Sequence, residues 1–241
     1  MEIRPSLADF KRLAKRATVV PVWGELVADL ETPVSAFLKL DDGQHSFLLE
    51  SVEGEEKVAR FSFLGSRPRL LFASRGREVE IVERHGATRA VLKRYRTDGD
   101  PLKEIERLLR DFSVAPTPGL PRFYGGLVGY LGYNVARFIE RLPAHQVDRL
   151  GVADIMMMLA DSMVIVDHAQ HKMLIVVNAL TREAPPEALY RRCVGRIRDM
   201  AQRLARPMPR RRTRRASQRR TQRLVRSNLT KTQFTRMVQR A

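Results

Sequence analysis

Residues 46–65 read S-F-L-L-E-S-V-E-G-E-E-K-V-A-R-F-S-F-L-G, and the rest of the chain is organised around them. The apolar run 47–49 and the alternating apolar positions of 61–65 predict two strands, with a charged, polar connection between them. Glu50 and Ser51 directly follow the first run. Because a buried carboxylate needs a partner, Glu50 either ends the strand in solvent or belongs to a site, and both interpretations stay open.

The composition is that of a globular protein with a hydrophobic core. The chain has 241 residues, of which 44% are hydrophobic. Cys193 is the one cysteine, which excludes a disulfide framework and suits the reducing cytoplasm. It lies in a helix-like run, where an inert buried thiol is favoured over a nucleophile. No run of about 18 apolar residues exists and the N-terminus has no signal-peptide pattern, so we expect a cytoplasmic protein without a membrane span.

The net charge of +17 is concentrated at the end of the chain. Residues 206–241 hold 13 Lys or Arg and no acid, whereas residues 1–205 hold 31 basic and 27 acidic residues. Ten of the 21 residues in 206–226 are Arg, and such a block repels itself and stays extended. It is either a solvated linker or an arm that binds nucleic acid through phosphates. No aromatic residues interleave to stack bases, so such binding would be non-specific.

Periodicity on both sides of the central stretch predicts a mixed fold. Thr32 is a suitable N-cap, and Pro33 suits the first position of a helix. The expected helices are 33–40, 101–112 and 185–206, and the expected strands are 69–74, 78–82, 163–167 and 172–178. Because helices and strands do not alternate regularly, we expect an α+β fold with antiparallel, β-sandwich-like sheets flanked by helices.

A glycine-rich segment, 125–133, raises the question of a phosphate cradle. Its spacing is G-G-x-x-G-x-x-G, which matches neither the dinucleotide fingerprint nor a Walker A motif. A strand whose small residues admit close packing is therefore the favoured interpretation, with a helix over 134–140 following it. The three consecutive methionines of 156–158 are expected to fill core space.

Two histidines, His168 and His171, have a spacing that suggests a metal site. They lie in the turn predicted between the strands 163–167 and 172–178, and no cysteine or carboxylate is placed as a third ligand. A structural metal site needs about four ligands, so we expect no metal here.

Three stretches carry a resemblance to a known family. They are residues 46–65, quoted above, residues 19–40 (VVPVWGELVADLETPVSAFLKL) and residues 123–143 (FYGGLVGYLGYNVARFIERLP). Together they resemble the N-terminal region of anthranilate synthase component I, and the match extends over about 5–205. The resemblance implies that 1–205 is the family's N-terminal regulatory domain and that it has the same α+β architecture.

The resemblance also implies a ligand. In the family, the feedback site for L-tryptophan includes a Leu-Leu-Glu-Ser segment, which corresponds to Leu48, Leu49, Glu50 and Ser51. A carboxylate at Glu50 can pair with the ligand's ammonium group, Ser51 can add a hydrogen bond, and the leucines can form an apolar wall for the indole. We therefore expect Leu49, Glu50 and Ser51 to bind tryptophan.

Residues 227–241 resemble the first segment of the family's chorismate-binding catalytic domain. Thr230 is a plausible N-cap for a helix whose apolar face contains Phe234, Met237 and Val238. The family's catalytic residues and Mg²⁺ ligands belong to the remainder of that domain, which is absent from this sequence. We therefore expect a truncated chain with no catalytic residue, no metal and no cofactor of its own.

The parent enzyme converts chorismate and ammonia, delivered by a glutamine amidotransferase subunit, to anthranilate and pyruvate. The resemblance implies this subunit (component II) and the missing catalytic domain as partners. Alternatives stay open: a lyase subunit active only when complemented, an aminodeoxychorismate synthase-like component, or a nucleic-acid-binding protein that uses residues 206–226. Three features depart from the family: the Arg-rich linker, Asn134 at a position where the family usually has Asp, and the lack of the family's usual acids in the helix after Thr230.

Overall fold

The computed structural model describes residues 1–29, 31–50, 60–85, 88–142, 151–208 and 227–240. The chain divides into two compact units, Met1–Met208 and Pro209–Ala241, and we describe each by itself. The predicted connection at 51–59 and the Arg-rich segment 209–226 lie outside the described residues. Within the described part, no helix is long and apolar enough to cross a membrane.

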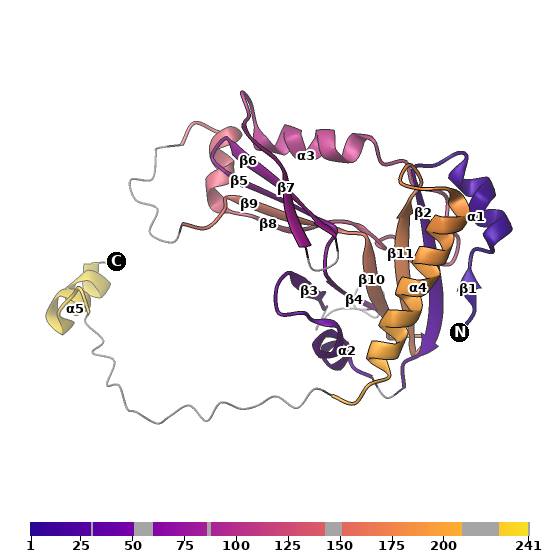
Figure 1. Ribbon diagram of the computed structural model, residues 1–241. Helices are drawn as coiled ribbons and strands as arrows, with labels where there is room; N and C mark the ends of the chain where they lie inside the picture. The colour runs from indigo at the N-terminus through magenta and orange to yellow at the C-terminus, as the bar shows by residue number, and fades with distance from the viewer. Residues whose placement is uncertain (30, 51–59, 86–87, 143–150, 209–226, 241) are drawn as a thin grey trace. The chain divides into compact units, whose positions relative to one another are not determined.

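The central stretch forms one edge of a six-stranded sheet (Figure 1). Every pair of neighbours in this sheet is antiparallel. In spatial order the strands are β1 (Ile3–Arg4), β2 (Val19–Val27), β11 (Lys172–Leu180), β10 (Ser162–Asp167), β4 (Phe61–Ser66) and β3 (Ser46–Leu49). The two strands predicted from residues 46–65 therefore exist and pair with each other, with Leu48 opposite Leu64.

A second sheet has five strands, which are also antiparallel. In spatial order they are β7 (Thr88–Arg96), β6 (Glu78–His85), β5 (Leu70–Arg75), β9 (Ile155–Ala160) and β8 (Gly126–Leu131). The chain passes between the sheets twice, from β4 to β5 through residues 67–69 and from β9 to β10 through Asp161 alone. Strands that switch sheets in this way make the corners between two packed sheets.

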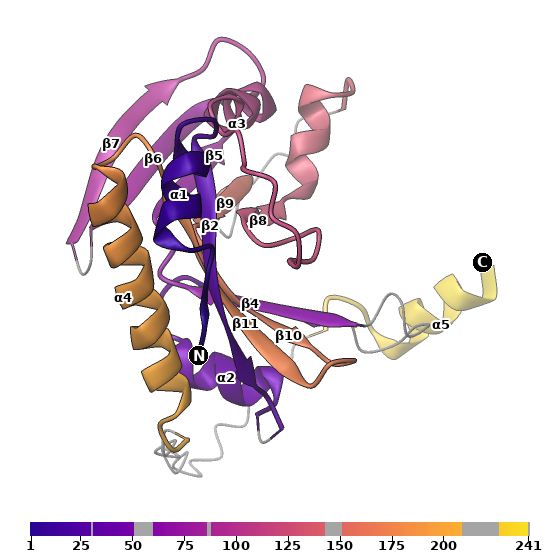
Figure 2. The ribbon, with the colours of Figure 1, turned by 90° about the vertical axis from the view of Figure 1, so that its right-hand side faces the viewer.

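Three helices cover one face of the six-stranded sheet: α1 (Leu7–Ala14), α2 (Pro33–Leu40) and α4 (Pro186–Leu204). Figures 1 and 2 show α4 running along β11 and β2. The helix predicted over 185–206 buries one apolar face in this core: Leu189, Cys193, Ile197 and Leu204 are each at most 3% exposed, and Met200 is partly buried against them. The Thr32 N-cap is also confirmed, because its hydroxyl accepts a hydrogen bond from Ser35 N at 3.0 Å.

The other face of the six-stranded sheet carries an aromatic cluster. Its buried members are Trp23, Ala160, Met163, Ile165, Leu174 and Val176, and its partly buried members are Phe47, Phe61, Phe63, Leu120, Phe123, Tyr124 and Val128. A third cluster joins the five-stranded sheet to α3 (Pro101–Arg110) and to the 3₁₀-helix η1 (Tyr133–Phe138). The fold is thus α+β with two antiparallel sheets and flanking helices, as predicted.

The glycine-rich segment forms strand β8, which confirms the strand interpretation. An ideal Cβ at Gly129 would lie 1.9 Å from the carbonyl oxygen of Met156, so the backbone of β9 approaches too closely for any side chain. The helix predicted over 134–140 is instead the short 3₁₀-helix η1, preceded by Gly132, which has no side chain to cap it. Of the three consecutive methionines, Met157 packs against the third cluster, and none of them is fully buried.

The second unit contains α5 (Lys231–Arg240). Thr230 caps it as predicted, because its hydroxyl accepts a hydrogen bond from Gln233 N at 3.3 Å. Within this unit the apolar face of the helix is exposed: Phe234 is 60%, Met237 58% and Val238 59% exposed.

Candidate functional site

A cavity of about 770 Å³ lies where the central stretch leaves the sheet. It is lined by the end of β3, by β4, by the start of β8 and by Phe123 just before it: Leu48, Leu49, Glu50, Phe61, Phe63, Phe123, Leu127, Val128 and Gly129. Leu49 and Glu50, two of the three residues predicted to bind tryptophan, are therefore both in its wall. The third, Ser51, lies outside the described residues.

Strand pairing explains how these side chains meet. Leu49 at the end of β3 lies opposite Phe63 of β4. The ring of Phe63 contacts the ring of Phe123 nearly edge-on, with 5.2 Å between centroids and an interplanar angle of 78°. Phe61 lies 6.2 Å from Phe63 on the same strand. The edge-to-face pair of Phe63 and Phe123 is a favourable aromatic geometry, and together with Phe61 it gives the cavity an apolar wall.

The two predicted leucines have different roles, because successive side chains of a strand point to opposite faces. Leu48 packs against the helix-covered core, whereas Leu49 is 45% exposed at the cavity. Leu48 nevertheless also lines the cavity, and Phe61, Phe63 and Phe123 add an aromatic wall beside both leucines. The sequence stretches that contain these phenylalanines were part of the resemblance, but no local pattern indicated that the three rings meet.

The charged residues at and next to the cavity are Glu50, which lines it, and Arg60, which precedes Phe61. Glu50 is exposed, which agrees with a strand that ends in solvent, and its role toward a ligand stays a prediction. Arg60 already has a partner: its Nε and Nη2 donate to the two carboxylate oxygens of Asp167 at 3.0 and 2.7 Å. Burial raises the pKa of Asp167, but the hydrogen bonds and charge of Arg60 together with the backbone N–H groups of Gln170 and Ala169 lower it, and the net shift is downward. Among the described residues that line this cavity, Glu50 is the carboxylate.

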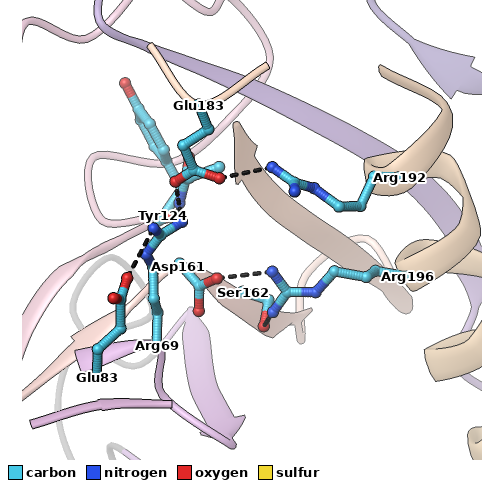
Figure 3. A network of polar contacts seen from close by, with 9 residues as sticks. Arg69, Glu83, Tyr124, Asp161, Ser162, Glu183, Arg192 and Arg196 are labelled. Atoms are coloured by element: carbon cyan, nitrogen blue, oxygen red, sulfur yellow. Dashed lines mark hydrogen bonds and ion pairs between the residues drawn. The ribbon is translucent and has the colours of Figure 1, made fainter. Parts of the chain in front are cut away.

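A second cavity, of about 790 Å³, lies between α4 and the switch from β9 to β10. It is rich in arginine, and Figure 3 shows how its charges are paired. Arg69 contacts both Glu83 and Glu183, and Arg192 donates to Glu183 at 2.5 Å. Because these arginines already hold carboxylates, the network connects α4 to the sheets and does not form a free anion site.

Arg196, on the right of Figure 3, reaches toward Asp161 and Ser162. Its two Nη atoms donate to Asp161 Oδ2 at 2.6 Å and to Ser162 Oγ at 2.7 Å. Burial lowers the pKa of Arg196, but the nearby Asp161 carboxylate more than offsets this, so the pKa is raised. Arg196 therefore stays charged and holds the point where the chain switches sheets.

The other residues considered for chemistry have structural surroundings. Burial raises the pKa of the Cys193 thiol to about 11, which confirms the interpretation of an inert thiol. His168 Nε2 lies 2.8 Å from the hydroxyl of Ser62, in the predicted turn between β10 and β11. In the part of the chain that the structure describes, no three His, Cys, Asp or Glu side chains are grouped closely enough to hold a metal ion.

Comparison with known proteins identifies the relatives of this chain. Anthranilate synthase component 1 of Acetivibrio thermocellus is 40% identical over 174 residues, which cover 72% of this chain and 34% of the relative. The same protein of Aquifex aeolicus is 36% identical over 205 residues, covering 85% of this chain and 40% of the relative. In Pseudomonas aeruginosa it is 36% identical over 207 residues, covering 85% and 40%.

A crystal structure of anthranilate synthase component I from Streptococcus pneumoniae TIGR4 matches with a TM-score of 0.48 and 24% identity, over 76% of this chain and 37% of that one. At this level the match adds nothing to the sequence relationship. No protein-family model matches the chain. The chain spans between 34% and 40% of the length of these curated relatives. It is therefore a homologue of anthranilate synthase component I, over about two-fifths of the length of those proteins.

Proposed function

We propose that this chain is the N-terminal region of anthranilate synthase component I that senses tryptophan and contacts the partner subunit. The parent reaction forms anthranilate and pyruvate from chorismate in cytoplasmic tryptophan biosynthesis. The proposal is supported by the relationship to curated anthranilate synthases at 36–40% identity. The feedback and contact roles are our inference from that relationship and from the cavity beside Glu50.

The observation that carries the proposal is the composition of the 770 Å³ cavity. Phe61, Phe63 and Phe123 offer an aromatic wall on which an indole ring can lie. Glu50 stands at the rim as a carboxylate that can accept a charge-assisted hydrogen bond from an α-ammonium group. An aromatic amino acid has both features, an apolar ring and a cation, and so fits this cavity better than an anion or a sugar does.

The remaining parts of the function belong to other polypeptide segments. We infer that the catalytic residues and Mg²⁺ lie in the chorismate-binding domain, and that a glutamine amidotransferase subunit supplies ammonia. Residues of the catalytic domain also complete the tryptophan site. Consequently this chain alone is expected to form no anthranilate and to bind tryptophan weakly. Saturable binding at millimolar or lower concentrations in calorimetry with the isolated chain would contradict that expectation.

A chimera tests the proposal directly. The matching segment of the Acetivibrio thermocellus relative is replaced by this chain, and inhibition of anthranilate formation by tryptophan is measured. We expect the chimera to be inhibited, and both Glu50→Gln and Ser51→Ala to raise the inhibition constant at least tenfold, which corresponds to about 1.4 kcal/mol. Asp29→Asn, at an exposed acid away from the cavity, is the matched control. Inhibition that is unchanged in both site variants would refute the proposed site.

A further inference from the structure

A smaller cavity, of about 310 Å³, lies where the chain passes from β9 to β10. It shares no lining residue with the cavity at Glu50, whereas Asp161, Asn178 and Leu180 also line the arginine-rich cavity. Its apolar walls come from β2, from α3 with the segment after it, and from β9 and β11, and include Val19, Leu109, Phe112 and Leu159. Asp161 and Asn178 line it as well. The volume is at the lower end of the range for small-molecule sites, so any occupant is small.

Two buried acceptor atoms at this cavity lack a donor. Asp161 Oδ1 and Asn178 Oδ1 accept no hydrogen bond from any residue that the structure describes. The side chain of Asp161 is 9% exposed, and Asn178 is also 9% exposed. Buried polar atoms without partners lower stability, so a native structure that keeps two of them side by side calls for an explanation.

The neighbouring hydrogen bonds hold these two oxygens in place. Asp161 Oδ2 is already occupied by Arg196, at 2.6 Å. The amide nitrogen of Asn178 donates to the carbonyl of Tyr124 at 2.8 Å, which makes the other amide atom, Oδ1, an acceptor. The backbone N–H of Asn178 donates to the carbonyl of Asp161 at 2.8 Å, so the two residues are fixed next to each other. The missing partner must therefore be a donor.

We propose that this cavity binds a small apolar molecule with a protonated amine, whose ammonium group donates to Asp161 Oδ1 and Asn178 Oδ1. An ammonium has three N–H donors and a positive charge, which suits one carboxylate and one amide oxygen. The two oxygens are buried, so an occupant reaches them only when the side chains of Asp161 and Asn178 rotate about their terminal torsions. This rotation loosens the hydrogen bonds from Arg196 to Asp161 and from Asn178 to Tyr124, and the new bonds from the ammonium must offset that loss. A hard metal ion would need six or more oxygen ligands, which these apolar walls do not supply.

Two classes of ligand carry an ammonium group on an apolar body: a simple amine and an apolar α-amino acid. Arg122 lines the same cavity with an exposed guanidinium, which could hold the carboxylate of an amino acid. Three probes of matched shape separate the two classes: leucine, its decarboxylated analogue 3-methylbutylamine, and its deaminated analogue 4-methylpentanoate. Calorimetric titration of the full chain at pH 7 measures the binding of each.

We expect leucine or 3-methylbutylamine to bind and 4-methylpentanoate to bind at least tenfold more weakly. Binding of both amines identifies the ammonium group as sufficient, and binding of leucine alone identifies an amino acid held also by its carboxylate. The highest probe concentration is about 10 millimolar, which is enough to detect weak binding. If neither leucine nor 3-methylbutylamine binds up to that concentration, the proposal is overturned and the two oxygens are assigned to buried water. Equal binding of all three probes also overturns it.

A cavity-filling variant locates the binding. Leu109→Trp places a large ring in the cavity from a helix position that is 37% exposed and outside the clustered cores. Leu38→Trp, on α2 and also 37% exposed, is the matched control because Leu38 does not line any of the three cavities. We expect the first to weaken amine binding at least tenfold and the second to leave it unchanged. Asp161→Asn tests whether the carboxylate charge of Asp161 is needed for amine binding. If Asp161→Asn fails to fold, Leu109→Trp still tests where the amine binds.

The test also separates this site from the proposed tryptophan site. Glu50→Gln changes the other cavity and is expected to leave leucine and amine binding unchanged. If Glu50→Gln abolishes binding while Leu109→Trp has no effect, the amine binds at the Glu50 cavity and the inference about Asp161 is overturned. The chimera experiment is independent of either outcome.

Discussion

Glu104 on α3 is a buried carboxylate whose replacement has a calculable effect on stability. It is 8% exposed and accepts three hydrogen bonds: from Thr97 Oγ1 at 2.7 Å, from Tyr95 OH at 3.0 Å and from Arg107 Nη1 at 2.7 Å. Tyr95 belongs to β7 and Thr97 follows it, so this carboxylate connects α3 to the edge of the five-stranded sheet.

Glu104→Gln retains the shape of the side chain and removes its charge. A hydrogen bond to a charged group contributes about 1.5–3 kcal/mol and a neutral one about 0.5–1.5 kcal/mol. Gln keeps one acceptor oxygen and has an NH2 donor in place of the other, so either the Thr97 or the Tyr95 hydroxyl must reverse its hydrogen bond and accept. The bonds with Thr97 and Tyr95 therefore lose about 1 kcal/mol each. The bond from Arg107 contributes little because that side chain is 62% exposed. The expected loss is about 2 kcal/mol of unfolding free energy, or roughly 4–8 °C in Tm for a chain of this size.

The effect depends on pH in a direction that follows from the pKa of Glu104. The hydroxyl of Thr97 lowers this pKa most; Tyr95 and Arg107 lower it further, and burial offsets part of the change. A carboxyl whose pKa is lower in the folded state contributes stability above its unfolded pKa of about 4.3, and this contribution is lost as the pH falls through the folded pKa. The difference between wild type and Glu104→Gln is therefore largest near neutral pH and shrinks below about pH 4.

Urea unfolding followed by far-UV circular dichroism, at neutral pH and at about pH 3.5, measures this difference. Glu106→Gln, an exposed acid on the same helix, is the control and is expected to stay within about 0.5 kcal/mol of wild type. A neutral-pH cost for Glu104→Gln no larger than the control's would refute the reasoning. A difference that grows toward acid pH would refute the assigned direction of the pKa.

Three further predictions concern other parts of the chain. Gly129→Ala should cost on the order of 2–3 kcal/mol, because its Cβ would lie 1.9 Å from the Met156 carbonyl oxygen; unchanged stability would be inconsistent with the pairing of β8 and β9. Cys193 should resist iodoacetamide at pH 7.5 in the native protein and react after denaturation in urea, because its pKa is about 11; rapid native labelling would contradict its burial. Deletion of residues 206–241 should abolish salt-sensitive retention on DNA, and retention by the shortened chain would instead assign the binding to residues 1–205.

Local patterns in the sequence were sufficient for most of the elements. The apolar runs before and after residues 51–59 became β3 and β4, and the stripe Leu189, Cys193, Ile197 and Leu204 became the buried face of α4. These predictions succeeded because side-chain period is a local property, close to 2 in a strand and 3.6 in a helix. The helix expected after β8 became the 3₁₀-helix η1, since a short segment with no capping side chain has little local preference to hold it in an α-helix.

The candidate site was only partly accessible from the sequence. The resemblance indicated Leu49 and Glu50, and the structure places both in the wall of one cavity. It did not indicate that Phe63 and Phe123 form the aromatic wall, because the two residues belong to segments far apart in the chain and meet only when β4 and the loop before β8 pack together. The resemblance also treated Leu48 and Leu49 alike, although successive side chains of a strand point to opposite faces of the sheet.

The sequence by itself determined most of the helices and several of the strands, the α+β class and the relationship to anthranilate synthase component I, because each depends on residue order over short stretches. The tertiary structure alone decided which side chains converge. Asp161 and Asn178 lie next to each other because β10 and β11 pair and the chain switches sheets at Asp161, and Thr97 reaches Glu104 because α3 folds back on its sheet. Such contacts depend on how whole elements pack, since packing minimises exposed apolar surface over the entire domain and no short stretch encodes its outcome.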